Sequence, residues 1–301
     1  MLRTLESNQP VAWLFVPLSS ALALAVWAEV VGNFPWSKII PSWLILIAAA
    51  RVIHRTHFAS GMTEQPTALP SFTAALVGTV LLTMEADVVM FLGLLAAAFS
   101  MRLGLIAGAA TRGQTGWMFA SAFMAGTAAL FDIGFIWGLP GLLLGIALMA
   151  RLRPPVVMAW IAGGLAPFWV AGALWWLEKG AGAWPMLVHS SQNLPTYHFN
   201  GPVFVALVWA GFGLLLRFKN RFHLTAVSRR AQMLTTVWTV VTFSGAAFAQ
   251  QGAAVAFWFV LFAAWNIPSA VPRSRFWGPA MVYAQIVLTI LATLLPVLAY
   301  A

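Results

Sequence analysis

The chain has no cysteine among its 301 residues, and only 8% of its residues are charged. The absence of cysteine excludes disulfides, thiolate chemistry and metals held by thiolates. Carboxylates are scarce as well, with 7 Asp and Glu against 16 Lys and Arg. The remainder is largely apolar: 61% of the residues are hydrophobic and the mean hydropathy is +0.88. This composition lies far outside that of soluble globular proteins and is typical of membrane proteins.

Apolar segments of about 16–22 residues follow one another along the chain, and such lengths can cross a bilayer as helices. The boundary between the fifth and sixth segments is soft, so ten spans is the alternative to eleven. The sequence predicts an all-α, polytopic transmembrane helix bundle that forms a single integral membrane domain over residues 1–301. The expected spans are 11–31, 39–54, 69–84, 87–105, 115–131, 133–150, 155–177, 201–216, 231–249, 252–270 and 279–300.

Basic residues alternate between the gaps that separate these spans. Only Lys38 and Lys179 fall in the odd-numbered gaps. The other 14 of the 16 Lys and Arg lie before the first span, in the even-numbered gaps or, for Arg51 and Arg102, in the last turn of a span that leads into such a gap. Cytoplasmic loops carry the excess of Lys and Arg, so the N-terminus is expected inside and the C-terminus outside. The net charge of +9 then reflects short-loop cations beside apolar spans. It predicts contact with anionic lipids at the inner face and no binding of nucleic acid.

The carboxylates show the opposite bias, which membrane insertion does not explain because Asp and Glu contribute little to orientation. Glu85 and Asp87 share one outer turn between the third and fourth spans. Two carboxylates this close can chelate one hard divalent cation, such as Mg²⁺ or Mn²⁺. The alternative is that Asp87 caps the fourth helix and Glu85 is solvated.

Two further outer acids are candidates for a catalytic base. Glu29 lies about one turn inside the outer end of the first span, where an ionisable residue suggests a functional site. Its side chain could instead reach the outer surface. Asp132 begins the sixth span, and helix capping is the alternative interpretation there.

The richest polar segment is the outer gap at 178–200, which contains His189 and His198. These histidines could act as acid and base or ligate a metal, and His198 is the catalytic candidate. Arg102, Lys179 and His189 are the candidates for substrate binding. The alternative is a hydrated loop with a short amphipathic helix. The segment 217–223 interleaves cations with aromatics and is expected to lie on the inner membrane surface as a lipid anchor.

Small residues and prolines inside two spans predict close helix packing or a kink. They are Gly163, Gly164 and Pro167 in the seventh span, and Pro140 and Gly141 in the sixth. Small side chains let helix backbones approach each other in a membrane. Mid-span charges and an internal repeat, the usual marks of a secondary transporter, are not evident.

Several motifs between about 69 and 177 carry a resemblance to a known family. They are Leu69-Pro70, the run Phe119–Phe131, Arg151-Leu152-Arg153, and Trp160, Gly164 and Pro167, together with Asn8-Gln9-Pro10 near the start. In these residues the chain resembles an uncharacterised family of multi-pass inner-membrane proteins found in Bacteroidota. The resemblance implies a bacterial inner-membrane location and a helical fold, but no activity.

A more distant similarity is carried by Glu29, Glu85 and Asp87. Their positions are similar to those of the acids on the first two outer loops of membrane glycosyltransferases that use polyprenyl-phosphate sugars. That similarity implies an enzyme handling polyprenyl-phosphate-linked substrates at the outer face. The alternatives are a non-catalytic subunit that contacts other membrane proteins of a cell-envelope complex and, third, a transporter.

Overall fold

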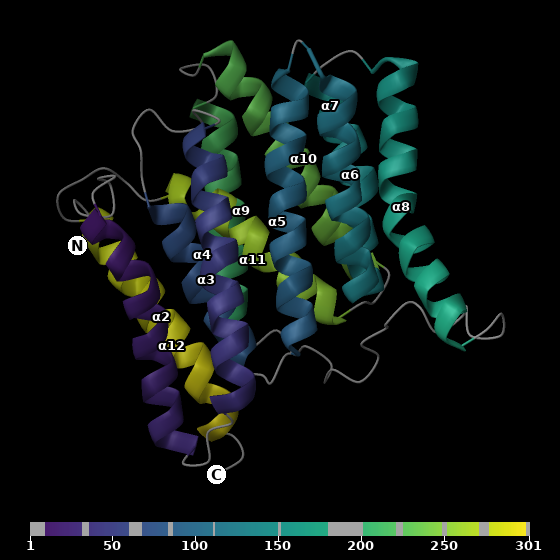
Figure 1. Cartoon of the computed structure of the whole chain (residues 1–301). Helices are drawn as coiled ribbons and strands as arrows, with labels where there is room; N and C mark the ends of the chain where they lie inside the picture. The colour runs from purple at the N-terminus through teal and green to yellow at the C-terminus, as the bar shows by residue number, and fades with distance from the viewer. Residues whose placement is uncertain are drawn as a thin grey trace. The chain divides into compact units, whose positions relative to one another are not determined.

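The computed structural model describes residues 10–31, 36–59, 68–83, 87–110, 112–149, 152–179, 201–220, 225–248, 252–270 and 277–298. These residues form eleven α-helices, one short 3-10 helix and no strand (Figure 1). The predicted all-α class is therefore confirmed for the described part of the chain. Contacts between residues divide the chain into two compact units, described separately below.

Unit 1 comprises Met1–Val88, Tyr197–Leu224 and Phe259–Ala301. Its central helix is α4, which contacts α2, α3 and α12 and is apolar on every side, as expected of a helix enclosed by others. Two hydrogen bonds join neighbouring helices: Trp43 Nε1 donates to Ser20 Oγ at 2.9 Å, and Thr73 Oγ1 donates to Gln285 Oε1 at 3.2 Å. Its helices are α2 (Pro10–Val31), α3 (Trp36–Ala59), α4 (Leu69–Thr83), α9 (Gly201–Asn220), α12 (Trp277–Leu298) and the later part of α11 (Gly252–Ala270).

Unit 2 comprises Val89–Thr196 and Thr225–Trp258. Within it α6 packs along α8, and α7 packs along α10. Helix α8 lies at the edge of this unit (Figure 1). Its helices are α5 (Val88–Ala109, of which Val88 belongs to unit 1), α6 (Gln114–Phe131), η1 (Ile133–Trp137), α7 (Gly138–Met149), α8 (Pro154–Lys179), α10 (Ala226–Phe248) and the first part of α11.

Glycines create the close packing of α6 against α8, as the sequence predicts. A Cβ atom added at Gly163 would lie 3.0 Å from the Phe119 carbonyl carbon and closer still to its oxygen. A Cβ atom at Gly126 would meet the Gly164 carbonyl in the same way, with Pro167 Cγ at 3.2 Å. Helix α8 continues through Pro167 to Lys179. These contacts are between backbones, so any larger side chain must separate the two helices.

The soft boundary in the sequence between the fifth and sixth spans is a change of helix type. Helix α6 ends at Phe131, Asp132 adopts an extended conformation, and the 3-10 helix η1 leads directly into α7. Two buried indoles from other helices hold this segment. Trp258 Nε1 donates to the Gly134 carbonyl at 3.0 Å, and Trp238 Nε1 donates to the Gly138 carbonyl at 3.1 Å. The two indoles also meet edge to face, with ring centroids 5.0 Å apart.

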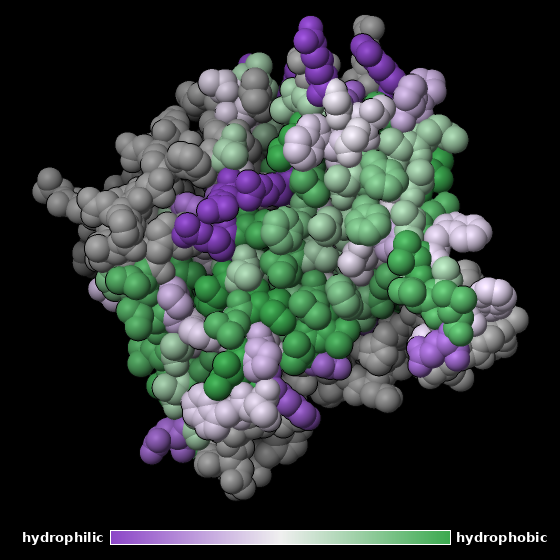
Figure 2. All heavy atoms as spheres, in the orientation of Figure 1, coloured by the Kyte–Doolittle hydropathy of each residue, from purple (hydrophilic) through white to green (hydrophobic). Residues whose placement is uncertain are grey.

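Large apolar side chains cover the outside of α8 at helical spacing. They include Leu165, Trp169 and Leu177, which are 51%, 70% and 74% exposed, with Met158, Ile161, Val170, Leu174 and Trp176 along the same helix. On the face of unit 2 that Figure 2 shows, hydrophobic side chains cover the middle of the helices and hydrophilic side chains gather towards their ends. Three described segments are long and apolar enough to cross a membrane: Trp36–His57, Val88–Ala109 and Pro154–Glu178.

Candidate functional site

The outer acids predicted to hold a cation are only partly described. Glu29 is the third residue from the end of α2, and Asp87 directly precedes α5; both side chains are exposed. Glu85 lies outside the described residues. Among the described residues no three His, Asp or Glu side chains gather as a metal site would require. A shared cavity formed by Glu29, Glu85 and Asp87 therefore stays a prediction.

Asp132 occupies the position that the capping interpretation predicts. Its side chain is 2% exposed, and its Oδ1 accepts a hydrogen bond of 2.8 Å from the Gly134 backbone N–H at the start of η1. An acceptor here satisfies one of the N–H groups that a helix start leaves without an intrahelical partner. The carboxylate thus has a defined structural task in forming the break between α6 and η1.

The remaining predicted residues lie on separate elements. Arg102 is half-buried on α5, which continues to Ala109, so Arg102 lies inside the helix rather than at its end. The seven residues of α5 that follow Arg102 correspond to about 10 Å of helix. Lys179 is the last residue of α8, and its side chain is not described. His189 and His198 lie outside the described residues.

Unit 1 contains a buried cluster around Arg217 that the site predicted from the sequence does not include. Arg217, in the last turn of α9, is 5% exposed. Its Nη1 donates to the Trp265 carbonyl oxygen at 3.2 Å and to Asn266 Oδ1 at 3.1 Å, both on α11. Asn266 Nδ2 in turn donates to the Phe262 carbonyl at 2.8 Å. A guanidinium held by neutral oxygens keeps its full positive charge, so this cluster is a fixed cation inside the unit.

Two histidines of α3 complete the cluster. His57 stacks on Trp265, with ring centroids 5.3 Å apart and an angle of 13° between the planes. His54 lies one turn earlier on α3, and both histidines are buried. His57 lies within electrostatic range of Arg217 and His54. Helices α3, α9 and α11 thus place the imidazole of His57 near the guanidinium of Arg217, with His54 one turn away on α3.

Gly213 brings α9 close enough to α11 for Arg217 to reach its partners. A Cβ atom at Gly213 would lie 2.7 Å from the Asn266 carbonyl carbon, so only glycine fits without moving one helix. The cluster can therefore act as a clamp between α9 and α11.

No motif in the sequence indicates directly that Arg217 is buried. The predicted span ended at 216, and 217–223 was expected to lie on the membrane surface, but α9 continues to Asn220 and encloses the arginine. Phe218 and Lys219 are exposed, as the surface interpretation predicts. The spacing of Gly213 and Arg217, one helical turn apart on one face, was the available signal for a close contact.

Comparison of the chain with protein-family models, with curated proteins and with solved structures finds no match in any of the three.

Proposed function

We propose that the chain is a multi-pass protein of a bacterial inner membrane, with about eleven spans, a cytoplasmic N-terminus and an outer C-terminus. The exposed apolar face of α8 is the observation that carries this proposal. In the most apolar stretch of 18 residues in α8, only 28% is buried inside the protein. Leaving one Leu-sized side chain in water rather than an apolar medium costs about 1.5–3 kcal/mol, and this face has eight large ones in succession. Helix α2 repeats the pattern with Leu14, Leu18 and Leu22, all exposed.

The sidedness is supported by the meeting of helix ends in unit 2. The C-terminal ends of α5 and α7 lie together with the N-terminal ends of α6, α8 and α10, since all five line one pocket. Spans that alternate in direction bring their ends together in this way. Arg112, Arg153, Arg229 and Arg230 lie at this end, which we assign to the cytoplasmic side.

Two single cysteines in the cysteine-free chain test the topology. Glu178 and Ala226 are both exposed, at opposite predicted sides. In intact cells, Glu178→Cys should react with an impermeant thiol reagent, and Ala226→Cys should react only after permeabilisation. Labelling of Ala226→Cys in intact cells would reverse the orientation.

We further propose that the protein is a glycosyltransferase-like enzyme that handles polyprenyl-phosphate-linked substrates at the outer face with a divalent cation. The supporting observation is that Glu29 and Asp87 are exposed and lie at helix ends assigned to that face. A cation held there would neutralise the charge that develops on a phosphate leaving group.

Binding of polyprenyl phosphate by the purified full chain, with and without Mn²⁺, tests this second proposal. Wild type should bind more tightly with Mn²⁺, and Asp87→Asn should lose that gain. Glu178→Gln, which removes an exposed carboxylate from the end of α8, is the matched control and should retain it. Binding unaffected by Mn²⁺ in wild type would reject the enzyme in favour of the non-catalytic subunit.

A further inference from the structure

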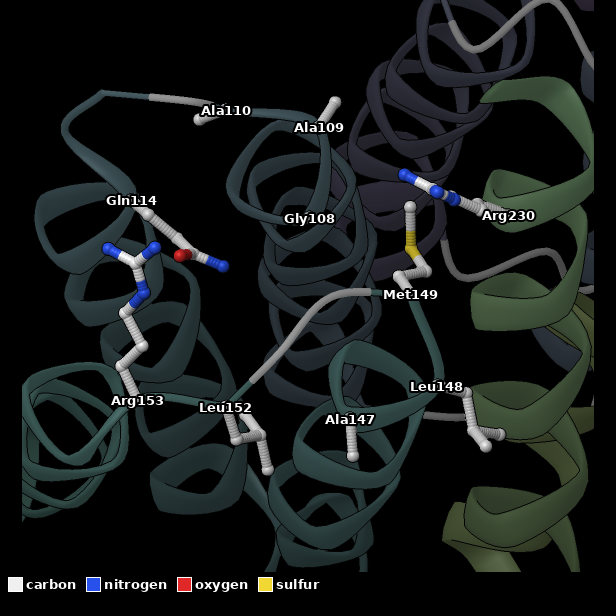
Figure 3. Close-up of a pocket in the computed structure, with 10 residues that line it drawn as sticks. All are labelled: Gly108, Ala109, Ala110, Gln114, Ala147, Leu148, Met149, Leu152, Arg153 and Arg230. Carbon is white, nitrogen blue, oxygen red and sulfur yellow. The ribbon is translucent and has the colours of Figure 1, made fainter. Parts of the chain in front are cut away.

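An open pocket of about 760 Å³ lies where the five helix ends of unit 2 meet. Figure 3 shows Gln114 and Arg153 extending from one side and Arg230 reaching in from the opposite side, above Met149. The other lining residues are small or apolar: Gly108, Ala109, Ala110, Ala147, Leu148, Met149 and Leu152. The pocket therefore has two guanidinium groups and one amide against an apolar wall.

The charge around this pocket is of one sign. None of its lining residues is a carboxylate. Asp132 and Glu178 are the only acids in the sequence of unit 2, and both lie at the far ends of their helices. Asp132 is separated from Gln114 by the length of α6, about 27 Å, and Glu178 from Arg153 by about 37 Å of α8. The two arginines thus create a positive pocket that no acid of the unit lies close enough to neutralise.

Guanidinium groups match phosphate oxygens in pairs, and an amide N–H adds a further donor. The volume falls within the range of pockets that enclose small-molecule ligands. Exposed Leu144 and Leu148, one turn apart on α7, continue the apolar wall away from the pocket. An apolar track leading from a phosphate-binding pocket is suited to an acyl chain.

We propose that this pocket binds the phosphate head group of an anionic lipid, with the acyl chain along Leu144 and Leu148. The site lies in unit 2 and uses none of the outer acids, so it rests on the proposed membrane location but is independent of the proposed enzyme activity. Free phosphate shares the head-group chemistry but makes no use of the apolar track, and the experiment separates the two sources.

The test measures binding of a fluorescently tagged phosphatidic acid to the full chain in a neutral detergent. Arg153→Gln and Arg230→Gln should each weaken binding about tenfold, because each loses charge-assisted hydrogen bonds to phosphate. Arg112→Gln and Arg229→Gln are the matched controls: both side chains are exposed nearby, and neither lines the pocket. They change net charge equally and should alter affinity less than twofold. An equal loss in all four variants would show a general surface field and overturn the site.

Ala147→Trp gives a second test that leaves charge unchanged. Ala147 is exposed on the pocket wall, so an indole there fills the space at little cost to the fold. Binding should fall at least tenfold while the melting temperature without lipid stays constant; undiminished binding would refute the pocket as the site. Inorganic phosphate and glycerol 3-phosphate should compete only at concentrations at least a hundredfold above those of phosphatidic acid. Competition at equal concentrations would overturn the lipid assignment.

Discussion

Replacing Gly163 with alanine should destabilise the protein by separating α6 from α8. The added Cβ would lie 3.0 Å from both Cα and the carbonyl carbon of Phe119, and closer to the carbonyl oxygen. Carbon atoms pack best at about 3.5–4.0 Å, so the helices must move apart by roughly half an ångström or more. Overpacking of this kind costs about 1–3 kcal/mol. The obstacle is backbone, which has no alternative rotamer.

The control is the same substitution where α6 is open. A Cβ at Gly116 would meet nothing within 4 Å. Gly116→Ala should stabilise the protein by about 0.5–1 kcal/mol, because alanine loses less conformational entropy than glycine on entering a helix. The same Gly→Ala substitution is thus expected to lower the free energy of unfolding at position 163 and to raise it at position 116.

The free energy of unfolding of both variants can be measured by titrating purified protein from neutral detergent into a denaturing detergent. Gly126→Ala, which meets the Gly164 carbonyl, should resemble Gly163→Ala. Because both act on one interface, the double variant should lose less than the sum of the two. A neutral or stabilising Gly163→Ala would refute the conclusion that these glycines set the distance between α6 and α8.

Three further predictions concern buried polar contacts. Arg217→Lys keeps the charge but lacks the planar group that reaches both acceptors on α11. It should destabilise the protein by about 1–3 kcal/mol in the same titration. An unchanged unfolding midpoint would contradict a role for Arg217 as a clamp between α9 and α11. Asp132→Ala should cost about 1 kcal/mol while Asp132→Asn is nearly neutral, since Asn caps helices as well as Asp. If Asp132→Asn instead abolished activity without loss of stability, the carboxylate would have a chemical role. Trp258→Phe should cost about 1–3 kcal/mol by leaving the buried Gly134 carbonyl without its donor, and hydrogen exchange should show whether η1 loosens.

Hydropathy located the helices well because span length and apolar composition are local properties of the sequence. The predicted segment 252–270 coincides with α11, and 69–84 and 115–131 differ from α4 and α6 by one residue at an end. The largest errors occur at charged ends. The segment 201–216 ends before Arg217, whereas α9 continues to Asn220, because a helix need not end where a cation begins.

The site was less predictable because it depends on which helices become neighbours. Asp132 was recognised as a possible cap from its position alone, and the structure places it as one. The association of Arg217 with Asn266 joins residues 49 positions apart, which no local pattern encodes. The pocket arginines were assigned only to an inner loop, since nothing in the sequence shows that Arg153 and Arg230 line one hollow. The grouping of Glu29, Glu85 and Asp87 remains a prediction.

The 3-10 helix η1 lengthens the segment that it forms with α7. Helix α7 alone has 12 residues, and η1 adds 5. At about 1.5 Å per residue for an α-helix and 2.0 Å for a 3-10 helix, the pair spans about 28 Å, close to the hydrocarbon thickness of about 30 Å. Seventeen residues wound entirely as an α-helix would extend only about 26 Å. The indoles of Trp238 and Trp258 supply hydrogen bonds to two carbonyl oxygens of this stretched segment. Under the proposed topology, this short segment would cross the membrane without exposing those carbonyls to lipid.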